Sequence, residues 1–304
     1  MNTIGETKLW SFCNDEEQEQ ALEVNSPTFV RRQKGHSVKS YMDLATKVAE
    51  LQFRNPDFVL MFRGQSTDYL NSKGNSTIKA SLFRASKHFV HNPKKTIHDP
   101  DNTPYLPSIA TLKERYQTLE KAEFFLVTHY ESEKFLGLQR LKRHRILRWA
   151  ILQHYEVCCT PLLDVTHSLR IAASFASNTA KDEAFIYVMG VPNLSGAITA
   201  SAEAGIQIVR IASVCPPSAL RPHIQEGYLL GEYPDMVSYD QKELYGHYEM
   251  DFARRLVAKF RFNPSTFWHA SAFPKVPRKA LYPPTDNDPL RKVAWNILQD
   301  LKRS

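Results

Sequence analysis

Long apolar runs and cysteine are both scarce in this sequence, and each scarcity argues against a class of protein. No stretch approaches the roughly 20 apolar residues that a membrane-spanning helix needs, so we expect no membrane partner. The four cysteines include no Cys-x-x-Cys pair, and the adjacent Cys158 and Cys159 cannot clamp one zinc ion with the usual ligand spacing. We therefore expect reduced structural thiols and no metal.

A secretory signal is also missing from the first residues. Residues 1–7 have neither the basic start nor the apolar core of such a signal, which predicts a cytoplasmic protein. The 304 residues are 42% hydrophobic, enough for a sizeable core without disulfide bonds or structural metal ions. The net charge of +7 predicts a surface that attracts polyanions, either nucleic acid (RNA or DNA) or an acidic partner protein.

The pattern of apolar residues predicts a mixture of helices and strands. Helices are predicted at residues 38–52, 109–141, 145–154, 168–176 and 290–301. Strands are predicted at residues 58–62, 162–165, 184–191, 207–212, 227–230 and 256–262. Residues 91–107 are rich in proline, asparagine and aspartate, which predicts an exposed loop. Because the chain shows no repeat and no clear linker, one α+β domain with a helical N-terminal layer is favoured.

A polar group follows the strand predicted at residues 58–62. Arg63 comes directly after five apolar residues and precedes Gly64, so its side chain can be held rigidly in a cleft. A guanidinium in that position suits bidentate contact with a phosphate or a carboxylate. An ion pair with an acidic neighbour is the alternative interpretation.

The strand predicted at residues 162–165 also ends in polar residues. Thr166 and Ser168 follow it and open a helix, where hydroxyls can cap the helix, hydrogen-bond a ribose or orient a carboxylate. His154 and Tyr155, just upstream, offer a titratable group and a stacking face, although a histidine at a helix end is commonly structural.

A third polar group precedes the strand predicted at residues 227–230. Glu226 could stabilise a cationic transition state or be a solvated turn residue, and Gln225 is the neutral candidate beside it. Arg221 could bind a second phosphate or complete a surface ion pair. Spacing alone does not separate these alternatives.

Several motifs together resemble the FRG domain family, which is named for a (Phe/Tyr)-Arg-Gly motif. The resemblance covers roughly residues 38–265, with residues 1–37 and 266–304 as N- and C-terminal extensions, the latter ending in a helix. It is carried by the following segments in order: Phe62-Arg63-Gly64-Gln65, Ser81-Leu82-Phe83-Arg84, Gln153-His154-Tyr155, Leu162-Leu163-Asp164-Val165-Thr166, and Arg221 with Gln225-x-Gly227.

The same segments resemble, more widely, the Arg-Ser-Glu class of ADP-ribosyltransferases. That class places an Arg-Gly on a first strand, a Ser-Thr-Ser-like strand end before an Ala-x-x-Phe-Ala helix, and a glutamate motif before a later strand. Arg63-Gly64, Thr166-His167-Ser168 and Gln225-Glu226 occupy these places in order. The strict position of the catalytic glutamate falls on Gly227. The implied fold is a split β-sheet core with an N-terminal and a central helical layer.

The resemblance to these transferases also implies roles for the motif residues. Arg63, with Gly64 and Gln65, would contact the phosphates or the nicotinamide-side ribose of NAD, which is a substrate here. Glu226 or Gln225 would act on the acceptor and on the oxocarbenium-like transition state. The remaining residues would brace the pocket, shape it or stack on the nicotinamide: His154, Tyr155, Asp164, Thr166 and Ser168.

Two functions of different classes are therefore expected. The first is an NAD-dependent ADP-ribosyltransferase, a toxin of a bacterial toxin–antitoxin or phage-defence system. It would modify nucleic acid, RNA favoured, or protein, and an antitoxin protein would be its partner. The second is a non-catalytic module that binds a nucleotide or nucleic acid in the same cleft, which the loss of the strict glutamate favours.

Overall fold

A computed structural model describes residues 8–13, 22–71, 73–84, 107–243, 251–269 and 273–304 of the chain. The strands are β1 (Leu9–Phe12), β2 (Leu22–Asn25), β3 (His36–Ser37), β4 (Val59–Gln65), β5 (Leu163–Thr166), β6 (Ala184–Val191), β7 (Ile198–Ser201), β8 (Ile206–Arg210), β9 (Gly227–Glu232) and β10 (Leu256–Phe262). The helices are α1 (Pro27–Arg32), α2 (Tyr41–Arg54), α3 (Ile109–Ser132), α4 (Leu138–Arg143), α5 (Arg145–His154), α6 (Leu169–Ser177), α7 (Leu220–Ile224), α8 (Tyr239–Glu243), α9 (Pro264–Phe267), α10 (Arg278–Leu281) and α11 (Pro289–Arg303). The fold is therefore mixed α+β.

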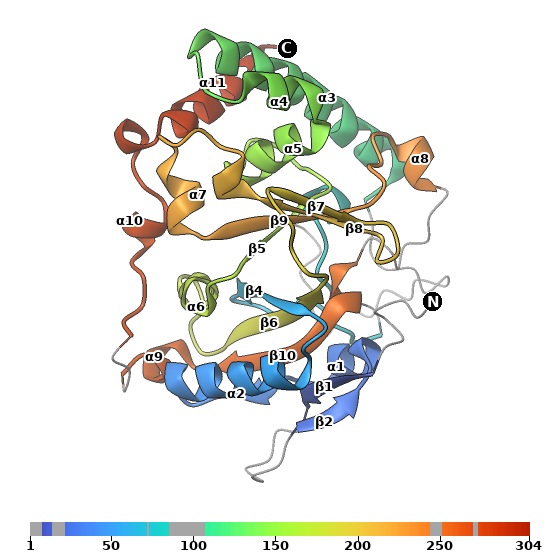
Figure 1. Cartoon of the computed structure of the whole chain (residues 1–304), viewed down its shortest axis with the longest axis vertical. Coiled ribbons are helices and arrows are strands. Elements are labelled where there is room, and N and C mark those ends of the chain that lie inside the picture. Colours follow the sequence, from blue (N-terminus) through green and yellow to red (C-terminus); the bar gives the residue numbers. More distant parts are fainter. Residues whose placement is uncertain (1–7, 14–21, 72, 85–106, 244–250, 270–272) are drawn as a thin grey trace.

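Eight strands form one mixed sheet in the order β3-β10-β6-β4-β5-β9-β8-β7. The pairing of β3 with β10 is parallel, and the other pairs are antiparallel. β4 pairs with β6 over its whole length, but β4 and β5 share a single pair, Phe62 with Thr166. The sheet therefore divides at this seam into a β3-β10-β6-β4 half and a β5-β9-β8-β7 half, which lie below and above one another in Figure 1.

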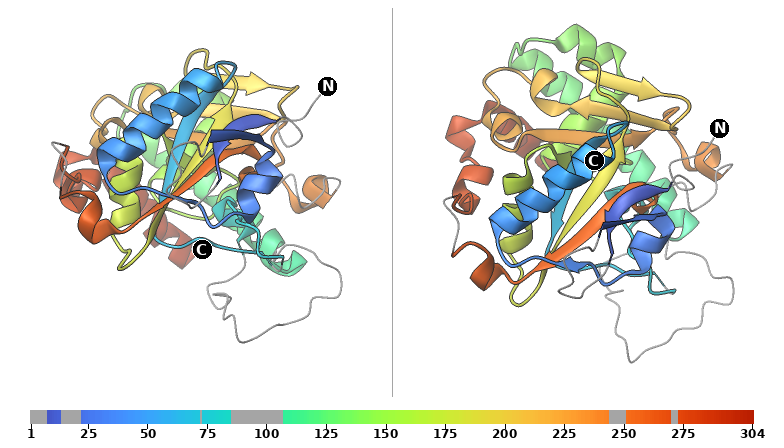
Figure 2. Two further views of the ribbon diagram at one scale, coloured as in Figure 1. Left: turned by 90° about the horizontal axis from the view of Figure 1, so that it is seen from below. Right: turned by 60° about the horizontal axis from the view of Figure 1, so that its bottom comes forward.

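Each half of the sheet is covered by its own helices. Below the seam, α2 and α6 pack on the sheet half that contains β10, and Leu44 and Leu51 of α2 are fully buried there. Figure 2 shows α2 lying across this half, with the β1–β2 pair beside it. Above the seam, α3, α5 and α11 bury a second core against β8 and β9. Burial of such apolar faces is the main source of stability for both layers.

The strands predicted at residues 184–191 and 256–262 are found at those residues as β6 and β10. The long helix predicted at residues 109–141 is wrong in one respect, because α3 ends at Ser132 and α4 begins after Gly137. Gly137 has a φ of +92°, in the left-handed region that favours glycine and breaks a helix. The loop predicted at residues 91–107 lies outside the described residues except for Pro107.

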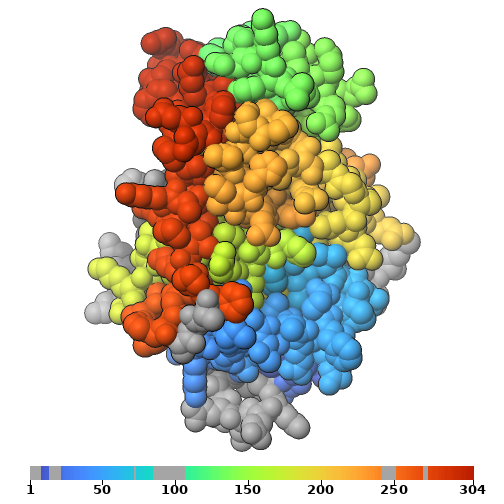
Figure 3. Space-filling view, turned by 60° about the vertical axis from the view of Figure 1, so that its left-hand side comes forward, coloured from blue at the N-terminus to red at the C-terminus, as the bar shows by residue number. Residues whose placement is uncertain are grey.

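Both extensions expected at the chain ends contact the sheet domain. In the N-terminal one, His36 and Ser37 form β3 and pair with β10. In the C-terminal one, α11 packs on α3, and residues 273–288, which lead to it, run along the side of the molecule in Figure 3. This segment carries Tyr282 past the seam, so a residue of the C-terminal extension reaches the central cleft.

Candidate functional site at the seam of the sheet

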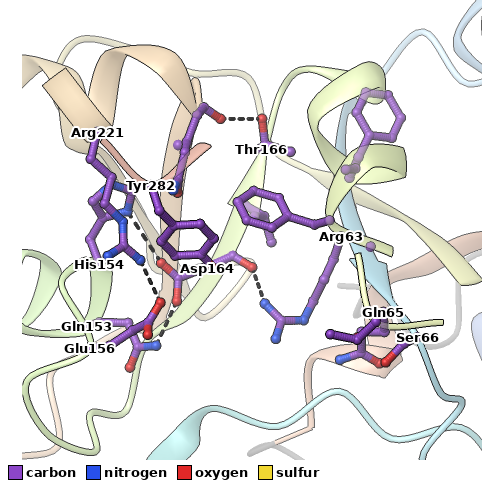
Figure 4. A pocket seen from close by; sticks show the side chains of 18 of the residues that line it. Arg63, Gln65, Ser66, Gln153, His154, Glu156, Asp164, Thr166, Arg221 and Tyr282 are labelled. Atoms are coloured by element: carbon purple, nitrogen blue, oxygen red, sulfur yellow. Dashed lines mark hydrogen bonds and ion pairs between the residues drawn. The ribbon is translucent and has the colours of Figure 1, made fainter. Parts of the chain in front are cut away.

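A cavity of about 390 Å³ opens at the seam between β4 and β5. Its size is within the range of small-molecule sites. Figure 4 shows side chains from both sheet halves meeting there. The lining residues are Phe62, Arg63, Gly64, Gln65, Ser66, Tyr69, Arg84, Gln153, His154, Glu156, Asp164, Val165, Thr166, Ala172, Phe175, Thr179, Arg221, Gln225, Gly227 and Tyr282.

Arg63 spans the seam from its position on β4. Its Nη1 donates a hydrogen bond to the carbonyl oxygen of Asp164 on β5 (2.5 Å), and its Nε is buried without a hydrogen-bond partner. Burial, reinforced by Arg84, lowers the pKa of Arg63 to about 10, so the guanidinium still carries its charge at neutral pH. Arg63 therefore offers a charged donor that no residue in the described part of the chain satisfies.

Position 64, directly after Arg63, has room only for glycine because α6 lies against it. A Cβ built on Gly64 would lie 1.9 Å from the carbonyl oxygen of Ala172 in α6, which no real contact permits. Glycine thus lets α6 pack directly on β4. The close approach also brings Ala172 and Phe175 of α6 to the wall of the cavity.

Asp164 supplies a carboxylate to the middle of the cavity. Gln153 Nε2 donates to its Oδ2 (2.6 Å), and His154 Nδ1 lies 3.6 Å from its Oδ1. Burial opposes ionisation of Asp164, but the contacts with His154, Gln153 and Arg63 outweigh it and lower the pKa of this carboxyl below its usual value. The side chain remains 37% exposed, so Asp164 is an ionised carboxylate that a ligand can reach.

His154 ends α5 beside Asp164 and is 2% exposed. Burial lowers the pKa of its imidazole, the contact with Asp164 opposes that shift, and Arg221 adds to it. A Cβ built on Gly227 would lie 3.3 Å from His154 Cε1. Ile211 Cγ2 would lie still nearer, at 3.0 Å, so the imidazole and Ile211 together fill the space beside position 227, where the transferase pattern would place its glutamate.

Arg221, on α7, lies across the cavity from Arg63. Its guanidinium stacks over the rings of Tyr282 (4.7 Å) and Tyr155 (5.6 Å), and its Nη2 donates to Glu156 Oε1 (2.6 Å). Its Nε is buried without a hydrogen-bond partner. The backbone N–H of Arg221 donates to the buried carboxylate of Asp288, which anchors the start of α7.

Several residues predicted for the site meet in this cavity. The lining contains Arg63, Gly64, Gln65, His154, Asp164, Thr166 and Gln225. Thr166 Oγ1 donates to the carbonyl oxygen of Gln225 (2.8 Å) and accepts from the N–H of Ser168 (3.0 Å). Gln225 Nε2 donates to the carbonyl oxygen of Leu281 (2.7 Å), so it ties the C-terminal segment to the cavity.

Three predicted residues are placed outside the lining. Tyr155 is buried, with its hydroxyl on both oxygens of Asp288 (3.0 Å each). Ser168 directly precedes α6, and its side chain makes no capping hydrogen bond. Glu226 is exposed on the turn before β9, where its φ is +44°.

The cavity is also lined by residues that no sequence pattern assigned to the site. Arg84 and Glu156 come from irregular segments, and Tyr69 and Tyr282 lie in stretches without helical or strand periodicity. Arg84 could have been found from the motif Ser81-Leu82-Phe83-Arg84. Tyr282 carried no comparable signal, because its place depends on the tether between Gln225 and Leu281.

The charges around the cavity define what it can bind. Arg63, Arg84 and Arg221 supply three guanidiniums, and Asp164 and Glu156 supply two carboxylates. Such a lining suits an anionic ligand that carries a group of positive charge near its centre.

Among the described residues, no three His, Cys, Asp or Glu side chains are grouped as they would be around a metal ion. No helix in the described part of the chain is long and apolar enough to cross a membrane.

Comparison with known families gives one match. Residues 59–184 match the model of the FRG domain, so the chain contains an FRG domain that starts with β4 and ends at the start of β6. This match confirms the resemblance to the FRG domain family over residues 59–184. No curated protein and no solved structure matches the chain.

Proposed function

We propose that this FRG-domain protein binds NAD in the cavity at the seam and transfers its ADP-ribose moiety to an acceptor. The observation that carries the proposal is the meeting of Arg63 and Asp164 in one cavity, from the two halves of a sheet divided at a single residue pair. This division also supports the proposal that the sheet is of the split, ADP-ribosyltransferase-like type.

The guanidiniums of Arg63 and Arg84 suit the diphosphate of NAD. Arg63 Nε is a buried donor without a partner, and leaving such a group unpaired costs roughly 1–3 kcal/mol. A phosphate oxygen would satisfy it. Arg84 lines the same wall, and the repulsion between it and Arg63 helps to lower the pKa of Arg63, so both would gain from a shared anion.

Asp164 suits the cationic centre of the reaction. When the bond between nicotinamide and the ribose C1′ breaks, the bonding electrons leave with neutral nicotinamide and positive charge develops on the sugar. An ionised carboxylate fixed beforehand by Gln153 and His154 stabilises such charge without reorganisation. The acceptor then forms the new bond to C1′ and loses its proton to solvent or a nearby base.

This assignment differs from the one that the resemblance to the transferases implies, in which Glu226 or Gln225 acts on the transition state. Glu226 is exposed and outside the lining, and position 227 is a glycine whose side-chain space Ile211 and His154 fill. We therefore propose Asp164, on β5, as the carboxylate that faces the sugar. Thr166 and Gln225 would hold the wall above it through their shared hydrogen bond.

To test this proposal, the purified chain is incubated with NAD labelled in the adenosine half. Two quantities are measured: the release of nicotinamide, and the transfer of label to nucleic acid or protein. Asp164→Asn is expected to reduce nicotinamide release at least about 100-fold, as loss of a major electrostatic contact does. Asp57→Asn, an identical change at an exposed position before β4, serves as the matched control. If Glu226→Gln removes the activity and Asp164→Asn keeps it, the assignment to Asp164 is wrong.

A non-catalytic binding module is the competing function, and the glycine at position 227 favours it. The same preparation decides between the two, because binding and turnover are measured separately. NAD binding without nicotinamide release in the presence of cell extract would establish a binding module. Arrest of bacterial growth on expression of the chain, absent with Asp164→Asn, would support the toxin role expected for the transferase.

A further inference from the structure

We propose that Arg221 forms a second anion subsite of the cavity, that this subsite takes a phosphate of single-stranded nucleic acid, and that Glu156 occupies it in the unliganded protein. The inference rests on the proposed function in one respect, because it identifies the nucleic acid as the acceptor of ADP-ribose. The binding itself is independent of NAD chemistry.

Arg221 has the features of a prepared anion site. Its side chain is only 10% exposed, yet it lines the cavity, and its Nε has no hydrogen-bond partner. Stacking over Tyr282 and Tyr155 fixes the plane of the guanidinium. A preoriented guanidinium loses little freedom when it binds a phosphate through two parallel donors.

Glu156 is a weak occupant of this subsite. Its carboxylate accepts from Arg221 Nη2 (2.6 Å), but the side chain is 63% exposed and makes no other hydrogen bond with the described residues. Ion pairs with such an exposed partner are worth about 0–1 kcal/mol. A phosphate that also reaches Nε would satisfy a donor that Glu156 leaves unpaired. Displacement of Glu156 by a phosphate is therefore favourable.

The Arg221 subsite is separate from the one formed by Arg63. Figure 4 shows the two guanidiniums on opposite sides of the Asp164 side chain. One diphosphate bridging both would have to pass the Asp164 carboxylate, which repels it. The second anion therefore belongs to a second molecule, and the Asp164 carboxylate lies between the two binding partners.

Single-stranded nucleic acid fits this second position better than a phosphoprotein. The rings of Tyr69, Phe175 and Tyr282 line the cavity, and aromatic side chains beside arginines are the usual means of holding unpaired bases. The net charge of +7 favours a polyanion over a peptide with one phosphate. A cavity of about 390 Å³ is of small-molecule size and cannot admit a duplex, so the strand would enter it unstacked, as with enzymes that act on single bases.

The test measures the anisotropy of a fluorescent six-nucleotide single strand titrated with the full chain, without NAD. Arg221→Gln is expected to weaken binding about tenfold and to reduce the slope of log K against log salt by about 0.7, the value for one phosphate contact on a single strand. Glu156→Gln is expected to tighten binding about threefold, because it removes the competing charge. An identical strand with an uncharged methylphosphonate backbone should bind equally weakly to all variants.

The controls separate a direct contact from a change in folding or total charge. Arg303→Gln makes the same charge change at the exposed end of α11 and should alter binding less than twofold. Glu156→Gln alters an exposed side chain and keeps the assay informative if Arg221→Gln does not fold. Unchanged binding by both Glu156→Gln and Arg221→Gln overturns the subsite. A phosphoserine peptide that binds more tightly than the strand, in an Arg221-dependent way, overturns the nucleic-acid assignment.

The outcomes also distinguish this inference from the proposed function. Arg221-dependent strand binding without any release of nicotinamide would leave the subsite standing and remove the transferase. Release of nicotinamide by a chain whose strand binding ignores Arg221 would keep the transferase and remove nucleic acid as the ligand of this subsite.

Discussion

Arg63 Nη1 donates to the carbonyl oxygen of Asp164 across a seam where the two strands share one residue pair. This contact uses one end of a planar guanidinium and leaves Nε for a ligand. Lysine keeps the charge but lacks the planar set of donors. We expect Arg63→Lys to weaken NAD binding about tenfold, measured by calorimetry. Binding at wild-type affinity would show that charge alone suffices.

A methyl group at position 64 should unfold the junction of β4 and α6. Because the Cβ would meet the Ala172 carbonyl oxygen at 1.9 Å, Gly64→Ala forces α6 away from the strand. We expect a loss of more than about 3 kcal/mol in the free energy of unfolding, measured with urea. Gly205→Ala is the control, because it has a φ of +57° with no atom within 4 Å and should cost only about 1 kcal/mol. Equal losses would contradict the steric explanation.

Loss of the Tyr155 hydroxyl should lower the free energy of unfolding more than it weakens NAD binding. That hydroxyl donates to the carboxylate of Asp288, which is fully buried and also receives the N–H of Arg221. Hydrogen bonds to a charged group contribute about 1.5–3 kcal/mol, so Tyr155→Phe should lower the free energy of unfolding by about 2 kcal/mol. Calorimetry of NAD binding should show a smaller effect than Arg63→Lys. The reverse order would indicate that Tyr155 contacts the ligand.

Acid should destabilise the fold partly through His154. Burial lowers the pKa of His154 below 6.5, Asp164 and Asp288 oppose this shift, and Arg221 adds to it. Below about pH 6.5 the unfolded chain therefore binds a proton that the folded chain refuses, and stability falls until the folded pKa is reached. Asp164, whose pKa is lowered from 3.8, contributes its own loss only at more acidic pH.

The variant His154→Gln tests this dependence. It removes the titrating group, so the difference in stability between wild type and variant should be largest above pH 6.5 and shrink on acidification toward pH 4.5. Urea unfolding across that range measures it. His223→Gln, at an exposed position on α7, is the matched control. A difference that stays constant with pH would mean that His154 titrates alike in the folded and unfolded chains.

The parts of the fold predicted from the sequence are those whose signal is local. β6 is a continuous run without charged side chains, and β10 is mostly apolar with Lys259 and Arg261 inside it, so the sequence predicted both strands at their observed ends. The two-residue β3 exists only because β10 offers it an edge. Similarly, α7 has Pro222 in its middle and no apolar period, and the buried Asp288 fixes its start.

The candidate site divides in the same way. Arg63 was predictable because it directly follows an apolar run, where polar side chains tend to reach a cleft. Asp164 lies inside β5, and only its place in the motif Leu162-Leu163-Asp164-Val165-Thr166 indicated a role in the pocket. Glu226 was a candidate because it precedes a strand, next to the place of the transferase glutamate, but its backbone has a φ of +44° and its side chain is exposed, as in the alternative of a solvated turn residue. Tyr282 depends on the bond from Gln225 to Leu281, a contact between residues 56 positions apart that no local pattern encodes.

The position of Tyr282 has a consequence during synthesis. The wall of the cavity uses Arg221, Gln225, Gly227 and Tyr282 in addition to residues of the FRG domain at 59–184. The ribosome must therefore synthesise residue 282 before the cavity can close around a ligand. Nascent chains and fragments truncated before residue 282 would therefore lack this wall and a complete cavity.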